Sequence, residues 1–246
     1  MPGMLEISES EARNKKGWLV ELKVDGTRMT YHKGVLTSDR NINRNARYGH
    51  ILEQVKQIDW KVRGEIAIPG SNIGQLNKKE NWHKAHYFIF DLYELRGKPI
   101  VGLDVFQIRA LIEKELKRAN LSHLHAPKLF KSFAEGWAHV KKHDAEGVVL
   151  KESDGTCWKC KLLKEEKLEI ISHVSGKAKG AFMIDRNGVQ SRVSGTSIDF
   201  VNAYKALSKA GKKVYAEIEY AFITDKGIPF QPRLRRIGTL QDLKFT

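Results

Sequence analysis

The amino-acid sequence predicts an α+β protein built from two domains. Most apolar residues lie in short β-prone runs separated by turn signals, and only a few longer segments have the period of an amphipathic helix. The composition changes after Leu162, where the charged segment Lys164–Lys167 indicates a hinge. We therefore expect a first domain over residues 1–163 and a second over residues 164–246, each large enough to bury a core.

The chain is strongly basic. Its 246 residues include 43 Lys and Arg against 29 Asp and Glu, which gives a formal net charge of +14. Nucleic acid is the partner that this charge favours, since neutralising phosphates releases condensed counterions; the alternative is a surface that is basic only for solubility. No apolar run is long enough to cross a membrane, and the N-terminus lacks the pattern of a signal peptide. We expect a monomer without a membrane partner, in the cytoplasm or in the cytoplasm of a virus-infected host.

Two β-prone runs flank Lys23 near the N-terminus. Residues 17–20 and 29–32 are predicted strands, and Asp25-Gly26 between them is a tight-turn signal, so the pattern predicts a hairpin with Lys23 close to its turn. Only a neutral amine is a nucleophile, so a reactive lysine needs neighbouring cations or desolvation that favour loss of its proton.

Later strands carry isolated charged or aromatic residues. Lys159 and Lys161 are two positions apart on one predicted strand, so their side chains point to the same side. The same strand contains Cys157 and Cys160, which are three apart and face opposite ways, so the pair predicts neither a zinc site nor a disulfide framework. Other notable residues beside apolar runs are Glu65 in Val62–Ile68, Phe90 in His86–Leu95, and Glu146 at the start of Glu146–Lys151.

Three segments predict helices. Asp104 is a candidate N-cap for a helix that ends near Arg118, residues 133–143 form a second short helix, and a third lies between the candidate N-cap Asp199 and the terminator Gly211. We assign the first of them a structural role and no chemistry. The second domain otherwise contains strand-like runs at residues 168–174, 181–185, 189–193 and 214–223.

Five segments, in order, resemble motifs of the covalent nucleotidyltransferase superfamily, which includes ATP-dependent DNA ligases, RNA ligases and mRNA capping enzymes. The matching residues are Lys23-Val24-Asp25-Gly26-Thr27-Arg28, Gly64-Glu65, Phe90-Asp91, Glu146-Gly147-Val148-Val149-Leu150-Lys151 and Lys159-Cys160-Lys161. The match is to a minimal ATP-dependent DNA ligase. This resemblance implies a nucleotidyltransferase domain of ATP-grasp-like antiparallel sheets with helices, followed by a small OB-fold β-barrel. In the second domain the likeness is looser and rests on Gly176–Gly180, Gly188 and Val193-Ser194-Gly195.

The resemblance also implies an activity. Lys23 would take AMP from ATP as lysyl-AMP, pass it to the 5′-phosphate of a nick in duplex DNA, and so allow the 3′-hydroxyl to seal the nick. Glu21 would accept from the adenine amino group, which favours ATP over GTP because a carboxylate repels the guanine carbonyl oxygen. The implied ATP-binding residues are Glu21, Lys23, Arg28, Glu65, Phe90, Glu146, Lys159 and Lys161.

Further contacts are implied for the metal and the DNA. Glu146 and Glu65 would hold Mg²⁺, and Arg40, or alternatively Arg44, would bind the nick 5′-phosphate. The sixth family motif is not clean in this sequence. Arg233, Arg235 and Arg236 are its candidates for orienting pyrophosphate, and a basic tail against the DNA backbone is the alternative.

Other functions remain open from the sequence alone. An RNA ligase or a capping guanylyltransferase would share the motifs. A non-catalytic nucleic-acid-binding protein would share the fold, although simple binding does not need the full set of Lys23, Glu146, Lys159 and Lys161.

Overall fold

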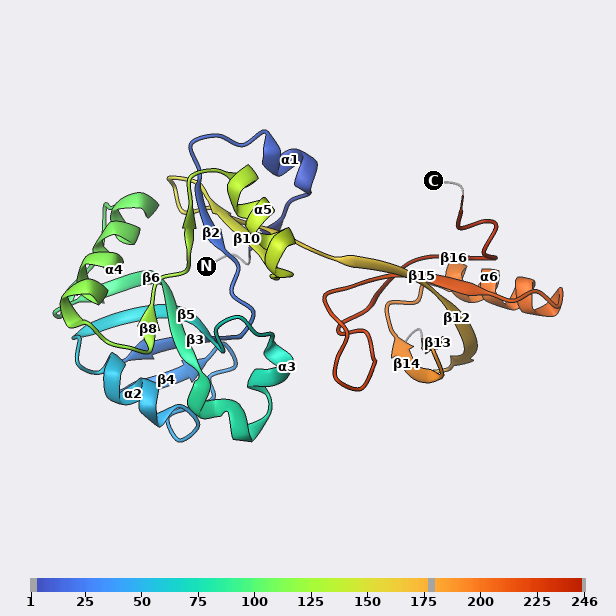
Figure 1. Cartoon of the computed structure of the whole chain (residues 1–246), viewed down its shortest axis with the longest axis horizontal. Helices are drawn as coiled ribbons and strands as arrows, with labels where there is room; N and C mark the ends of the chain where they lie inside the picture. The colour runs from blue at the N-terminus through green and yellow to red at the C-terminus, as the bar shows by residue number, and fades with distance from the viewer. Residues whose placement is uncertain (1–3, 177–179, 245–246) are drawn as a thin grey trace. The chain divides into compact units, whose positions relative to one another are not determined.

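The computed structural model divides the chain into two compact units, Met1–Leu162 (unit 1) and Leu163–Thr246 (unit 2) (Figure 1). It describes residues 4–176 and 180–244. Helices and several sheets are mixed along the chain, as predicted for an α+β protein. Residues 177–179, the centre of the glycine- and lysine-rich stretch noted above, lie outside the described residues. In the described part of the chain, no helix is long and apolar enough to span a bilayer.

The first sheet of unit 1 has five strands in the order β1-β11-β10-β2-β9. They are β1 Leu5–Glu6, β2 Leu19–Leu22, β9 Leu129–Phe130, β10 Gly147–Lys151 and β11 Cys157–Lys161. Only β1 and β11 pair in parallel among these strands. Side chains alternate between the two faces, so Val20, Val148 and Leu150 enter a core. The register places Glu21 beside Val149 and Val149 beside Lys159 on the opposite face.

The second sheet of unit 1 has the order β4-β3-β5-β6-β7, with β8 parallel to β6. Its strands are β3 Thr27–His32, β4 Val35–Ser38, β5 Trp60–Ala67, β6 His86–Leu95, β7 Lys98–Pro99 and β8 Leu124–His125. Met29, Ile66, Tyr87 and Ile89 are fully buried between this sheet and its helices. This sheet therefore has its own core, separate from that of the first sheet.

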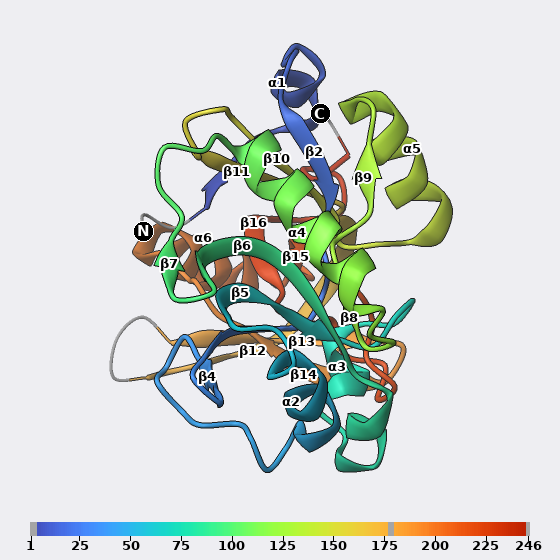
Figure 2. The same cartoon turned by 90° about the vertical axis from the view of Figure 1, so that its left-hand side faces the viewer.

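Helix α4, Val105–Ala119, lies along β6 (Figure 2). Its predicted N-cap is confirmed, because the Asp104 side chain accepts from the backbone N–H of Gln107 and the Gln107 side chain accepts from the Asp104 N–H. Helix α5, Phe133–His143, is also confirmed and packs on β10. The remaining helices of unit 1 are α1 Glu9–Arg13, α2 Gly49–Val55, α3 Ile73–Leu76 and the 3₁₀ helix η1 Lys79–Lys84.

The predicted hairpin around Lys23 is wrong. β2 and β3 lie in different sheets, and the chain crosses from one sheet to the other through residues 23–26. Asp25 does not close a hairpin turn, because its Oδ2 accepts from the backbone N–H of Ile73 at 3.0 Å. A Cβ at Gly26 would lie 2.2 Å from the carbonyl oxygen of Ile66. The glycine therefore permits close contact with β5, which local turn preferences do not reveal.

Unit 2 contains a five-stranded antiparallel sheet in the order β14-β13-β12-β15-β16. Its strands are β12 Lys164–Val174, β13 Ala181–Arg186, β14 Val189–Val193, β15 Tyr215–Tyr220 and β16 Arg233–Gly238. A parallel bridge between Ser194, directly after β14, and Arg233, the first residue of β16, connects the two edge strands of this sheet. Among the described residues, no continuous ladder closes this sheet into a barrel.

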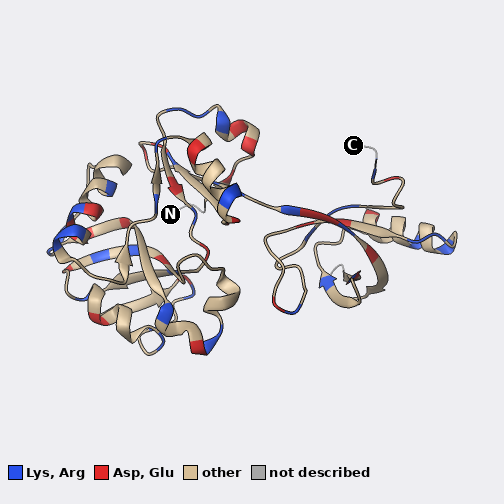
Figure 3. Cartoon of the chain, viewed as in Figure 1, with Lys and Arg blue, Asp and Glu red and all other residues tan. Residues whose placement is uncertain are grey.

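Two local predictions in unit 2 need correction. Helix α6, Ile198–Lys209, is capped by Ser197, whose Oγ accepts from the Phe200 N–H at 3.1 Å; Asp199 instead lies in the first turn. The predicted hinge Lys164–Lys167 is the start of β12 and pairs with β15. Cross-strand partners hold its charges within the sheet, as Glu166 accepts from Arg186 at 2.9 Å. Figure 3 shows basic and acidic residues interspersed along these strands.

Candidate active site

A cavity of about 320 Å³ in unit 1 is lined by residues of both sheets. Lys23 lies on its wall, where the chain leaves β2, and the Lys23 N–H donates to the carbonyl oxygen of Gly147 at 2.9 Å. The polar and charged side chains of the lining include Glu21, Lys23, Arg28, Arg63, Glu65, Asp91 and Lys151. The crossing between the sheets thus places the candidate nucleophile where both sheets can contribute charged groups.

Glu146 joins Lys23 to Lys161. The Lys23 Nζ is 2.6 Å from Oε2 of Glu146, and the Lys161 Nζ is 2.9 Å from Oε1 of the same carboxylate. Glu146 directly precedes β10 and Lys161 ends β11, and these two strand ends are neighbours because Gly147 pairs with Lys161. The structure therefore brings together three of the residues that the sequence predicted for one site.

The second sheet contributes Arg28 and Glu65 to the cavity. They face each other across β3 and β5, with 3.9 Å between the Arg28 Nε and the Glu65 Oε2. Burial raises the pKa of Glu65 to about 7, although Lys23 and Arg28 act in the opposite direction. Burial, with a further contribution from Glu146, also raises the pKa of Asp25. Negative charge at these carboxyl groups is therefore costly unless a cation comes close.

The donor set fits a magnesium ion that binds together with a nucleotide. Magnesium usually takes one or two carboxylates and completes its shell with water and substrate phosphates. Glu65 and Glu146 meet the first requirement, and the raised pKa of Glu65 indicates a site where added positive charge is favourable. Across residues 4–176 and 180–244, no group of three or more His, Cys, Asp and Glu side chains could hold a metal by itself.

Phe90 reaches the cavity because of an irregularity in β6. Arg63 pairs with Asp91 while the next residue of β5, Gly64, pairs with Ile89, so Phe90 has no opposite residue. Such a bulge changes the direction of neighbouring side chains, and both Phe90 and Asp91 line the cavity. An aromatic ring in this wall can stack on a planar base.

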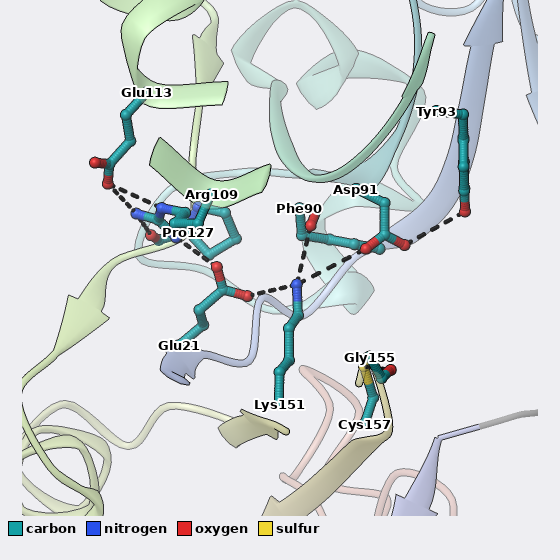
Figure 4. Close-up of polar contacts among 10 residues, drawn as sticks. All are labelled: Glu21, Phe90, Asp91, Tyr93, Arg109, Glu113, Pro127, Lys151, Gly155 and Cys157. Carbon is teal, nitrogen blue, oxygen red and sulfur yellow. Dashed lines mark hydrogen bonds and ion pairs between the residues drawn. The ribbon is translucent and has the colours of Figure 1, made fainter. Parts of the chain in front are cut away.

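A buried charge network surrounds Glu21 (Figure 4). Its Oε1 lies 2.5 Å from the Arg109 Nη1, and its Oε2 lies 3.0 Å from the Lys151 Nζ. Lys151 also donates to the carbonyl oxygen of Phe90 at 2.9 Å and lies 3.8 Å from the Asp91 carboxylate. Burial raises the pKa of Asp91, and the positive charge of Lys151 partly offsets this rise. The network fixes one end of the cavity, with Glu21 and Lys151 on its surface.

Five predicted residues of unit 1 lie outside the cavity lining. Two of them, Glu146 and Lys161, are connected to Lys23 through the Glu146 carboxylate. The other three are Lys159, Arg40 and Arg44. Lys159 shares a face of β11 with Lys161, but its Nζ is 3.3 Å from Oε1 of Glu6. Arg40 is exposed in the turn that follows β4, and Arg44 is partly buried a few residues later. Arg40 is therefore open to solvent, whereas Arg44 is only partly accessible.

The three candidate arginines of unit 2 lie on a strand and not in a basic tail. A register shift between β15 and β16 places Arg235 and Arg236 so that both reach acidic residues of β15. Arg235 pairs with Glu219, and the Arg236 Nε lies 2.5 Å from Oε2 of Glu217. Arg233 is at the beginning of β16.

Four residues of the site or its support received no role from the sequence. Lys151 ended a recognised motif and Arg63 directly preceded another, Gly64-Glu65, so each had a weak signal. Asp91 stood out as a charge in an apolar strand. Arg109 lies four residues after Val105 and three before Ile112, so it is on the apolar face of its helix, but no motif in the sequence indicates its partner. Only the packing of α4 shows that it is buried.

Comparisons with known proteins agree with the motifs. Residues 16–165, more than half of the chain, match the family model described as RNA ligase. No curated protein is a match in sequence. The fold is similar to that of a Lig E DNA ligase, with a TM-score of 0.67 and 16% identity over 97% of this chain and 100% of that one. A mycobacterial DNA ligase D complexed with ATP and MES gives a TM-score of 0.54 and 19% identity over 96% and 94%. The resemblance to ligases of the nucleotidyltransferase superfamily is thus confirmed, and the chain belongs to the RNA ligase family, with the fold of these DNA ligases.

Proposed function

We propose that the chain is an ATP-dependent DNA ligase that seals 5′-phosphate/3′-hydroxyl nicks in duplex DNA. The observation that carries this proposal is the Lys23 amine on the wall of a cavity, held by Glu146 and facing Arg28 and Glu65. A scaffold that only bound nucleic acid would not need a partly buried lysine among such groups. The fold shared with DNA ligases and the net charge of +14 support a DNA substrate.

In the first step, Lys23 attacks the α-phosphorus of ATP. The bond from Nζ to phosphorus forms as the bond to the bridging oxygen breaks, and pyrophosphate leaves. The Glu146 carboxylate, 2.6 Å from Nζ, is positioned to receive the proton that the amine must lose. Lys161 and Arg28 offset the phosphate charge, and Phe90 stacks on the adenine. A magnesium ion beside Glu65 and Glu146 would supply further neutralisation of the phosphates.

In the later steps, AMP moves from Lys23 to the nick 5′-phosphate, and the 3′-hydroxyl then displaces AMP. We assign the nick phosphate to Arg40, which is exposed after β4, or alternatively to Arg44, which is partly exposed in the same segment, residues 39–45. Lys159 is a second cation for the nucleotide phosphates, on the same strand face as Lys161. The arginines of β16 remain the candidates for contacts with pyrophosphate or the DNA backbone.

We further propose that residues 1–163 are the adenylation domain and residues 164–246 an OB-fold domain. Five antiparallel strands whose edges meet at one bridge suit the partly open barrel of that fold. OB-folds commonly bind nucleic acid, which gives unit 2 a role in holding the DNA.

RNA ligation is the second candidate function. The observation that favours it is the family model itself, which is described as RNA ligase and matches residues 16–165. Both candidates share the lysyl-AMP step, so only the nucleic-acid substrate separates them.

Mass spectrometry of the intact protein tests the proposal. The protein is incubated with magnesium and either ATP, GTP or NAD, and nicked duplexes of DNA or RNA are then added. We expect an AMP adduct from ATP alone, discharged by sealing of nicked DNA. Lys23→Arg keeps a cation beside Glu146 but should form no adduct. Discharge by RNA alone would favour the second candidate, a GMP adduct would indicate capping, and no adduct despite DNA binding would leave a binding protein.

A further inference from the structure

Glu21 is held from two sides at the base of the cavity (Figure 4). Its side chain is only 2% exposed, and each carboxylate oxygen has one cationic partner, Arg109 on Oε1 and Lys151 on Oε2. A carboxylate has about four acceptor positions, so one or more lone pairs remain for a ligand that enters the cavity. The two cations come from different elements, α4 and β10, and together they restrict the rotation of the carboxylate.

Arg109 is itself fixed at every end of its guanidinium. Nη1 contacts Glu21, Nη2 donates to the carbonyl oxygen of Pro127 at 2.7 Å, and Nε donates to Oε1 of Glu113 at 2.8 Å. The side chain is 8% exposed. Glu21 and Pro127 line the cavity, whereas Arg109 lies behind them. A rigid fork of donors therefore sets the position of two parts of the wall without occupying the cavity.

We propose that Arg109 is a positioning residue that sets the base preference of the nucleotide site by holding Glu21. The proposal rests on the function proposed above, in which the base enters this cavity. An ionised carboxylate only accepts hydrogen bonds, so a fixed Glu21 favours a ring that presents an amino group, as adenine does. Guanine presents a carbonyl oxygen at that position and is repelled.

Loss of Arg109 would free one oxygen of a buried carboxylate. The side chain could then turn toward Lys151 alone, and the wall at Pro127 would lose its donor. The amino group of adenine would then face a poorly placed acceptor. The repulsion between Glu21 and the carbonyl oxygen of guanine would weaken, so GTP would be excluded less strongly. Binding of the base would suffer, while the attack by Lys23, which other side chains surround, would change little.

The experiment measures lysyl-nucleotide formation with ATP and with GTP for the full chain and for Arg109→Gln and Arg109→Lys. We expect Arg109→Gln to raise the KM for ATP about tenfold, to change kcat less than about twofold, and to narrow the ATP-to-GTP preference about tenfold. Arg109→Lys should shift the preference in the same direction by about threefold, because one ammonium cannot hold both Glu21 and Pro127. Arg118→Gln, on the same helix but 58% exposed, is the matched control and should behave as the unchanged protein.

A double variant separates positioning from general damage. The double variant Glu21→Gln/Arg109→Gln should have the same ATP-to-GTP preference as the single variant Glu21→Gln. A further change of the ATP-to-GTP preference in the double variant would overturn the proposal. So would an unchanged ATP-to-GTP preference in whichever of the two Arg109 variants folds. A lower kcat with an unchanged KM would overturn it as well. Absence of any adduct in the unchanged protein is a different result, since it would refute the proposed function itself.

Discussion

Lys161 and Lys159 offer a matched pair of substitutions on one strand. Both lie on the same face of β11, and their side chains are 23% and 24% exposed. They differ in their partners, since Lys161 pairs with the Glu146 that also holds Lys23, whereas Lys159 pairs with Glu6. We expect Lys161→Ala to slow self-adenylation much more than Lys159→Ala does.

The size of each effect follows from this environment. A lysine that contacts a transferring phosphoryl group in a preorganised site contributes about 3 kcal/mol, or about 10²-fold in rate. Stability should change by less than about 1 kcal/mol in either variant, because the lost ion pair is partly exposed to water. That change corresponds to a melting temperature within about 4 °C of the unchanged protein.

Single-turnover transfer of labelled AMP from ATP to the protein measures the adenylation rate directly, and thermal unfolding of the same samples checks the fold. The reasoning fails if the adenylation rate falls by the same factor in both variants, because the contact of Lys161 with Glu146 would then make no difference to catalysis. It also fails if Lys161→Ala adenylates at the unchanged rate.

Three further outcomes are expected. Burial, with His125 and neighbouring histidines, lowers the pKa of His86 from 6.5 to about 4, so the unfolded chain takes up the proton more readily. The stability that comes from neutral His86 is present above about pH 6.5 and is lost as the pH falls toward 4. In urea titrations, the free energy of unfolding of His86→Phe should therefore fall less between these pH values than that of the unchanged protein, and an equal fall would contradict this. Gly26→Ala should lower the free energy of unfolding by about 1–3 kcal/mol, because its Cβ would overlap backbone, whereas Gly49→Ala, with open space around it, should be near neutral in the same urea titration. Phe90→Ala should raise the KM for ATP about tenfold or more through loss of stacking, and an unchanged KM would remove the ring from the base site.

Local patterns in the sequence were sufficient for much of the fold. The helix from Asp104 was predictable because a cap, a period and a terminus all lie within one short segment. Lys161 and Glu146 were predictable as a set through the motifs, and the structure places them together. The motifs therefore predicted which residues belong to the site, but not how the fold brings them together.

Features that depend on distant contacts could not be predicted. Asp25-Gly26 is typical of a hairpin turn, but Asp25 accepts from the backbone of Ile73, Gly26 packs on β5, and the flanking strands enter separate sheets. Arg109 is 88 residues from Glu21 in sequence, and nothing near either residue indicates their contact. Ser197 displaced Asp199 as a helix cap, although both are suitable and only two positions apart.

The carboxylate shared by Lys23 and Lys161 has a consequence for turnover in the proposed reaction. Once Lys23 carries AMP, it is no longer an ammonium, so Glu146 keeps one cation out of two while a new phosphate anion arrives beside it. The charged intermediate is then less well balanced than the resting protein. Departure of AMP to the next acceptor restores the original pairing of Glu146 with both lysines, so the adenylated intermediate is biased toward passing its nucleotide on.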